Sequence, residues 1–158
     1  MFNPIRWLRV QKAEAHCDIP CGIYDPIAAK IAAQTVQKMV LRIQALEKPA
    51  ANADARAWAT YNNTLSRYVA VKEDHAELCK REVRVIWSDY FRPEHLQKYP
   101  DLHKTVWETE KLAGRNKQTV DMDAARQLVD SVDRFAQVFW ETKNVNYSDP
   151  NAAARYGT

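Results

Sequence analysis

The sequence predicts an all-α protein in which the helices form an up-down-up-down four-helix bundle. Glycine and proline number only 3 and 7 among 158 residues, and no tract of alternating β-branched residues appears. Apolar residues instead recur at helical spacing in four stretches that are separated by short polar links. Short links force consecutive helices to run antiparallel, and a chain of this length is expected to form one domain.

The first two helices are predicted from caps and periodicity. Asp25 and Pro26 supply an N-cap and a first-turn proline, and the first helix is expected to end near Lys48 and Pro49. The second helix begins between residues 52 and 54 and continues to Arg92 and Pro93, which is unusually long for one helix. Its apolar stripe contains Trp58, Tyr61, Leu65, Tyr68, Val69, Ala76, Cys79, Val83, Ile86, Trp87 and Tyr90.

The second half of the chain is predicted in the same way. Residues 93–100 form a polar connection with room for a short helical turn, after which Asp101 caps a third helix that Gly114 to Asn116 ends. A fourth helix follows from Thr119 or Asp121. Residues 145–158 show no apolar stripe and are predicted to be a loose tail, so the domain organisation is 1–15, 16–144 and 145–158.

Five aromatic side chains and one cysteine are interpreted as structural. Cys79 lies on an apolar helical stripe and is expected to be a small buried hydrophobe. The aromatic residues expected in the core or in a subunit interface are Trp58, Trp87, Phe135, Phe139 and Trp140.

Charge and hydropathy exclude two classes of partner. The formal net charge is +3, of which Arg6, Arg9, Lys12 and Glu14 contribute +2, so that only +1 remains for the rest. This balance argues against nucleic-acid binding. No run approaches the roughly 18 apolar residues of a membrane span. The same basic residues interrupt the leader where a signal peptide would be apolar, so residues 1–15 are expected to be a removable pro-segment of a cytoplasmic protein.

The stretch HCDIPCGIYDP, residues 16–26, has the composition of a metal site. Its two cysteines lack the further ligands of a closed structural zinc site. If the chain were cut before His16, however, the new amine, the amide of Cys17 and the thiolates of Cys17 and Cys21 would together provide a square plane. Tetragonal nitrogen and sulfur coordination favours nickel or copper. The leader would then mask the amine until it is removed.

HCDIPCGIYDP, together with WSDYF at 87–91, Pro93, His95, KYP at 98–100, LH at 102–103 and FWETK at 139–143, resembles the nickel superoxide dismutases. The similarity covers most of the chain from His16 onward. It implies a four-helix bundle that assembles into a homohexamer, with nickel as cofactor and a peptidase that removes residues 1–15.

The resemblance also implies roles for individual residues. The metal ligands would be the amine and imidazole of His16, the amide and sulfur of Cys17, and the sulfur of Cys21. Tyr24 would stand over the metal and admit only small anions, Tyr90 would lie behind it, and Asp18 would help to fix the loop. The implied reaction converts superoxide to dioxygen and hydrogen peroxide by cycling between divalent and trivalent nickel.

One departure and two alternatives accompany this interpretation. The glutamate and arginine that support the axial imidazole in the family correspond here to Ala32 and His75, which leaves His75 or Glu77 as a substitute support. His95 and His103 are interpreted as structural or interfacial. The alternative functions are a nickel or copper carrier without turnover, which would not need Tyr24 and Tyr90 to exclude larger anions, and a helical interaction module without metal.

Overall fold

The computed structural model describes residues 22–157 of the chain, and every regular element in that range is a helix. The prediction of an all-α fold is therefore confirmed. In chain order the helices are α1 (Ile27–Gln44), α2 (Ala55–Asp89), α3 (Pro93–Lys98), α4 (Leu102–Gln118), α5 (Met122–Thr142) and α6 (Ala152–Tyr156).

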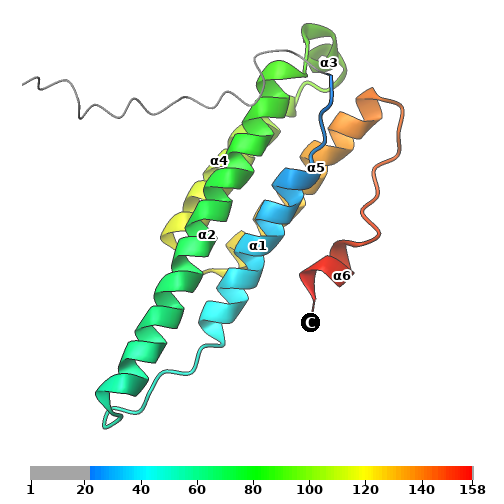
Figure 1. Cartoon of the computed structure of the whole chain (residues 1–158). Helices are drawn as coiled ribbons and strands as arrows, with labels where there is room; N and C mark the ends of the chain where they lie inside the picture. The colour runs from blue at the N-terminus through cyan, green and yellow to red at the C-terminus, as the bar shows by residue number, and fades with distance from the viewer. Residues whose placement is uncertain (1–21, 158) are drawn as a thin grey trace, which may run out of the picture.

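The four long helices form a closed ring of neighbours. Helix α1 packs against α2 and α5, and α4 packs against the same two helices. The chain direction alternates from α1 to α2 to α4 to α5, and α3 crosses one end of the bundle (Figure 1). This arrangement is the predicted up-down-up-down four-helix bundle.

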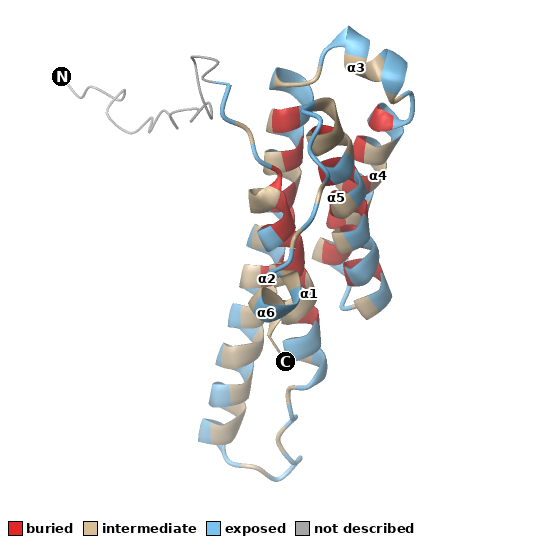
Figure 2. Ribbon diagram, turned by 90° about the vertical axis from the view of Figure 1, so that its right-hand side faces the viewer, coloured by how far each residue is buried: buried red, intermediate tan, exposed pale blue. Residues whose placement is uncertain are grey.

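Helix α2 is a single helix of 35 residues, about 52 Å long at 1.5 Å per residue. Its buried residues begin only at Lys72. Figure 2 shows the reason, because the first half of α2 and the end of α1 extend past α4 and α5. Trp58 and Tyr61 lie in this extension with their ring centroids 6.1 Å apart, and both side chains are half-buried.

The core lies between the four long helices and consists mainly of small side chains. Alanine and valine allow the helix axes to approach closely, and two phenylalanines are the largest apolar side chains that are fully buried. Phe135 and Phe139 are fully buried, as predicted, whereas Trp87 is 36% exposed. The buried apolar cluster contains Ala29, Ala32, Ala33, Val36, Ala76, Cys79, Val83, Ile86, Leu102, Val106, Ala113, Leu128, Val132, Phe135 and Phe139.

Three helices begin beside an aspartate at or within the predicted start, whereas Asp101, the predicted cap of α4, precedes that helix without a side-chain capping hydrogen bond. Asp25 and Asp54 accept hydrogen bonds from the amides of Ile27 and Ala57, at 2.8 and 2.7 Å. Asp121 accepts from two amides in the first turn of α5, at 2.9 and 3.2 Å. Each carboxylate satisfies amide groups that have no partner inside the helix.

The predicted ends of two helices differ from the structure. Helix α1 ends at Gln44, four residues before Lys48, and leaves through a tight turn. Gly114 does not stop α4, which continues to Gln118. The helix is instead held by the Asn116 side chain, which donates to a carbonyl of its own helix and to the Ala124 carbonyl of α5, each at 2.9 Å. A tertiary contact thus overrides the local helix-breaking signal.

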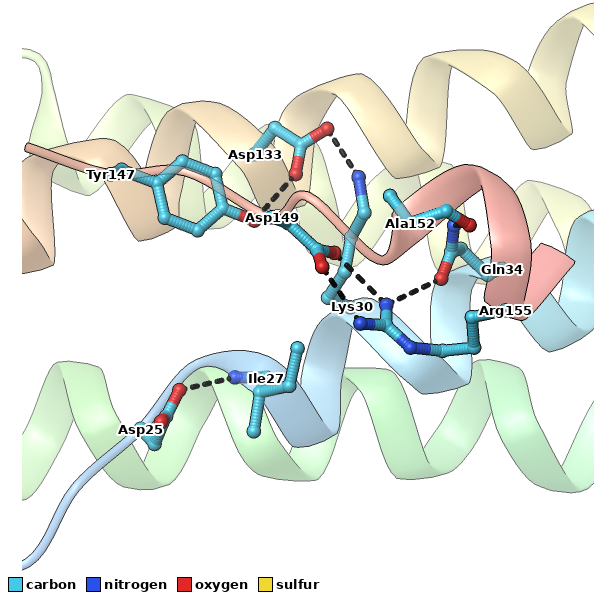
Figure 3. A network of polar contacts seen from close by, with 9 residues as sticks. All are labelled: Asp25, Ile27, Lys30, Gln34, Asp133, Tyr147, Asp149, Ala152 and Arg155. Carbon is cyan, nitrogen blue, oxygen red and sulfur yellow. Dashed lines mark hydrogen bonds and ion pairs between the residues drawn. The ribbon is translucent and has the colours of Figure 1, made fainter.

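The C-terminal segment is held against the bundle and is not the loose tail that the sequence suggested. The carboxylate of Asp149 accepts two hydrogen bonds from Arg155, at 2.9 and 2.7 Å, and Arg155 also donates to Gln34 of α1 at 2.8 Å (Figure 3). The Gln34 amide donates in turn to the Ala152 carbonyl at 3.0 Å. Polar contacts hold this segment, which explains why it shows no apolar stripe.

A second anchor joins the tail to α1 and α5. The Tyr147 hydroxyl donates to Asp133 at 3.0 Å, and Asp133 pairs with the nearly buried Lys30 (Figure 3). Burial raises the pKa of the Tyr147 phenol, and the hydrogen bond to Asp133 raises it further. Lys38 completes the attachment by donating to the Gly157 carbonyl at 2.8 Å. The tail therefore stabilises α1 in the turns that follow residues 16–24, the predicted N-terminal metal-binding hook.

Acidification is expected to remove the contribution of Asp149. The hydrogen bonds from Arg155 hold the pKa of this carboxyl below its ordinary value of 3.8. Because the native state then binds fewer protons than the unfolded state, stability falls as the pH drops through the native value. In urea unfolding, the free energy of unfolding of the wild type should exceed that of Asp149→Asn by about 1 kcal/mol at pH 6, and the difference should be smaller at about pH 3, below the ordinary pKa of the carboxyl group.

Asp74→Asn is the matched control for this experiment, because Asp74 is exposed on α2. This control should follow the wild type at both pH values. A difference between wild type and Asp149→Asn that stayed constant across the acid range would contradict the assignment.

No helix among residues 22–157 is long and apolar enough to cross a membrane.

Candidate metal centre

The predicted ligands lie just outside the part of the chain that the structure describes. His16, Cys17, Asp18 and Cys21 precede residue 22, as does the predicted pro-segment 1–15. The described chain begins at Gly22, which has φ +75°, a conformation that side-chain-bearing residues rarely adopt. Tyr24 follows two residues later, so the structure shows the surface beside which the hook joins the bundle.

Tyr24 and Tyr90 are neighbours at this end of the bundle. Their ring centroids are 5.7 Å apart and their planes meet at 56°. Tyr24 comes from the segment before α1, and Tyr90 is the residue that caps the end of α2. The roles of Tyr24 as a gate and of Tyr90 as its support remain predictions, for which this contact supplies the required proximity.

An aromatic and cationic shell fixes the ring of Tyr90. His95 of α3 stacks on it with 5.5 Å between centroids and only 13° between planes. Phe139 packs at 4.7 Å, and the ammonium group of Lys143 lies 5.0 Å from the ring centroid, within range of a cation–π interaction. The Tyr90 hydroxyl lies 2.6 Å from Thr142 Oγ1. These contacts come from α3 and the end of α5, so Tyr90 has a defined position.

A pocket of about 350 Å³ opens beside the two tyrosines. This volume lies at the lower end of the range of small-molecule pockets, about 300–1,000 Å³. Its lining combines aromatic, cationic and acidic groups and consists of Gly22, Tyr24, Asp89, Tyr90, Arg92, Glu94 and His95. Gly22 and Tyr24 connect the pocket directly to the cysteine-containing stretch.

The candidate supports for the His16 imidazole have other partners. Ala32 lies in the buried core and offers only a methyl group. His75 Nδ1 donates to the Val71 carbonyl at 2.9 Å, and His75 is fourteen residues, about 21 Å, from the end of α2 beside the pocket. Glu77 pairs with Lys117 at 3.1 Å, and the hydrogen bond from that lysine lowers its pKa. Within one chain, these contacts give no support to either substitute.

Cys79 has the structural role that its position predicted. Its side chain is fully buried in the core, and desolvation raises the pKa of its thiol to about 12. A buried thiol of this kind is neither nucleophilic nor ready to bind a metal. Among residues 22–157 no group of three or more metal-binding side chains comes together.

Two residues that contact Tyr90 received no role from the sequence. Thr142 and Lys143 belong to the FWETK stretch, which contributed to the family resemblance but suggested no contact with WSDYF. The tertiary fold brings the two stretches together across 52 residues. His95 was interpreted as structural or interfacial, and the structure places it in the pocket lining.

A four-helix bundle with an aromatic pocket directly after a His-Cys-x-x-x-Cys segment defines a class of small helical metalloenzyme. Residues 11–143 match the family described as nickel-containing superoxide dismutase. The chain belongs to this family. Residues 144–158 lie beyond the matched region.

Curated and solved proteins agree with this assignment. The chain is 40% identical to superoxide dismutase [Ni] of Streptomyces coelicolor over 129 residues, which cover 82% of this chain and 88% of that protein. It is 39% identical to the Streptomyces seoulensis protein of the same name, over 84% and 91% of the two chains. The native structure of a nickel superoxide dismutase superposes with a TM-score of 0.66 at 37% identity, covering 81% of this chain and 99% of that one.

Proposed function

We propose that this chain, once it begins at His16, is a nickel-dependent superoxide dismutase. Membership of the nickel-containing superoxide dismutase family supports both the reaction and the metal. The observation that carries the proposal is the junction between the His16–Cys21 stretch and the pocket lined by Tyr24 and Tyr90. The test is nickel analysis together with superoxide decay on the chain from His16, and decay no faster with nickel than without it would contradict the proposal.

The donor set of the hook fits nickel. His16 would bind through its amine and imidazole, Cys17 through its amide nitrogen and sulfur, and Cys21 through its sulfur. Thiolate and nitrogen donors in a tetragonal arrangement suit nickel or copper in preference to zinc. Nickel, bound there, supplies a divalent/trivalent couple that can both oxidise and reduce superoxide.

The residues of the chain itself control access and charge. Tyr24 follows the two cysteines in sequence, lines the pocket and packs on Tyr90. It can therefore restrict access so that only small ions approach. Arg92 lines the pocket and Lys143 lies beside it, so these two cations balance the carboxylates of Asp89 and Glu94 at this end of the bundle. Asp18, which precedes the described residues, is proposed to fix the loop. Restricting access also protects the cysteine sulfurs, which peroxide oxidises readily.

Replacing Tyr24 with phenylalanine is expected to keep the metal and change the kinetics. The ring would still pack on Tyr90, whereas the hydroxyl would no longer order the approaching anion or water. We expect a rate reduced by about 10-fold or altered saturation by superoxide, together with faster inactivation by peroxide. Stopped-flow superoxide decay and timed peroxide exposure measure both effects. Wild-type behaviour in both assays would remove the gating role.

A nickel or copper carrier without turnover is not favoured, because the family match identifies an enzyme. Turnover separates the two functions directly, since a carrier would bind nickel and leave superoxide decay at its spontaneous rate.

We also propose that the mature chain forms a homohexamer in the cytoplasm after a peptidase removes residues 1–15. Support for assembly comes from the surface between α2 and α4, where Trp107 is 60% exposed and Trp87 is 36% exposed. Large exposed aromatics of this kind are typical of protein interfaces. Light scattering on the purified chain from His16 tests the assembly, and a monomer would contradict it.

A further inference from the structure

The hydroxyl proton of Tyr90 has a defined direction. Thr142 Oγ1 lies 2.6 Å from the Phe139 carbonyl and donates to it, because a carbonyl oxygen can only accept. That bond uses the single proton of the threonine hydroxyl. In the 2.6 Å contact between Tyr90 and Thr142, the tyrosine must therefore be the donor. Because its only hydroxyl proton is used in this way, Tyr90 can act only as a hydrogen-bond acceptor toward a ligand in the pocket.

The ring of His95 also has a defined tautomer. The backbone amide of Arg92 donates to His95 Nδ1 at 3.2 Å, so this nitrogen carries no proton in the neutral ring. The proton is then on Nε2, at the other side of the ring. Among the described residues the imidazole makes no second hydrogen bond, and the ring is held by stacking on Tyr90 and by an edge contact with Phe91. His95, which lines the pocket, thus has an Nε2–H donor that no described acceptor uses.

Net charge alone does not explain how this pocket would hold an anion. Asp89 and Glu94 line it together with a single cation, Arg92, and only the nearby Lys143 restores neutrality. All three lining charges are at the surface and therefore well screened. A directed donor on a fixed ring is the stronger means of binding a small anion.

We propose that His95 donates a hydrogen bond from Nε2 to the substrate anion in this pocket. Thr142 accepts the proton of the Tyr90 hydroxyl, so that this proton is directed away from the anion and the Tyr90 oxygen can only accept. His95 is then a catalytic residue that contacts superoxide, and Thr142 is a positioning residue that acts through Tyr90. The inference deepens the proposed dismutase function and rests on it. Its structural premise, however, can be tested in the full chain without nickel.

The first test uses nitrogen NMR on the metal-free chain of 158 residues. The ¹⁵N shifts of His95 should identify the Nε2–H tautomer, and azide, as a small anionic probe, should move its resonances in a saturable way. His103 is the matched control, because its Nδ1 also accepts a hydrogen bond, from Trp87 at 2.9 Å, but it lies on α4 away from the pocket. A proton on Nδ1 of His95, or equal effects of azide on both histidines, would overturn the proposal.

The second test measures superoxide decay with the nickel-loaded chain from His16. His95→Phe keeps the stacking but removes the donor, and should lower kcat/KM about 10- to 100-fold. His95→Gln, which retains an N–H donor, should recover part of this loss. Thr142→Val should alter azide affinity, whereas Thr142→Ser should not. Wild-type kcat/KM in a folded His95→Phe variant would overturn the role of His95.

If the wild-type chain showed no turnover at all, the dismutase proposal would fail while the NMR result still decided the tautomer and the anion site. The failures of the two proposals are therefore distinguishable.

Discussion

A chain that begins at His16 is expected to bind nickel and remove superoxide, whereas the chain that retains residues 1–15 is expected to do neither. The physical reason is the amine. In the longer chain the nitrogen of His16 is part of a peptide bond with Ala15, so it is not available as an amine donor. The expected effect is loss of essentially all catalysed decay, measured by stopped-flow spectroscopy with nickel content determined in parallel.

Two cysteine variants extend this prediction to the sulfurs. Cys17→Ser and Cys21→Ser in the chain from His16 should each abolish nickel-dependent turnover and the sulfur-to-nickel absorption, since a hydroxyl is a much harder and less donating ligand than a thiolate. Cys79→Ala is the matched control, because Cys79 is buried in the core. The control should keep the absorption and the turnover while losing some stability.

Three outcomes would contradict the ligand scheme. They are full activity in the chain that retains residues 1–15, activity that survives in either serine variant with another metal, and loss of nickel in the Cys79→Ala control. The last would place a metal at a thiol that the structure buries among apolar side chains.

The fold could be predicted from sequence where a local signal decided the structure. Asp25, Asp54 and Asp121 begin their helices because a carboxylate caps the amides that directly follow it. Gly114 was misleading because Asn116 of the same helix donates to the Ala124 carbonyl of α5, a tertiary contact that holds the last turns of α4. The C-terminal segment was missed for a similar reason, since ion pairs and hydrogen bonds to α1 and α5 leave no periodic pattern in the segment itself.

The candidate site divides in the same way. The stretch from His16 to Tyr24 is contiguous in the chain, so its residue types and spacing are enough to suggest metal chemistry. The roles proposed for Thr142 and His95 depend instead on the direction of hydrogen bonds. Such directions depend on which neighbour has already used a proton, and this information is not contained in residue spacing.

The second large effect is expected at Lys72, which shows what the sequence pattern cannot reveal about stability. Its side chain is only 2% exposed, although lysine is rarely buried. Its ammonium group donates to the carbonyls of Asn116, Lys117 and Thr119, the latter two at 3.0 Å. These carbonyls terminate α4, where backbone acceptors have no helical partner and where positive charge is favourable.

Lys72→Met should lower the free energy of unfolding by about 2–3 kcal/mol, because methionine fills a similar space but removes every donor from the buried carbonyl of Asn116. A buried acceptor without a partner costs about 1–3 kcal/mol by itself. The other two carbonyls belong to less buried residues, so water can replace part of their hydrogen bonding. Urea unfolding followed by circular dichroism measures the loss. Lys104→Met, at a lysine whose side chain is 69% exposed, should stay within about 0.5 kcal/mol of the wild type.

Alkaline pH separates the cost of burying Lys72 from the benefit of its hydrogen bonds. Burial lowers the pKa of this ammonium from its ordinary value of 10.5. Between the lowered native value and 10.5, the unfolded state binds more protons than the native state, so the stability of the wild type relative to Lys72→Met should increase with pH in that window. Below the window the difference should be constant. A difference that shrank as the pH rose would mean that Lys72 gains more from its charge in the native state than burial costs it.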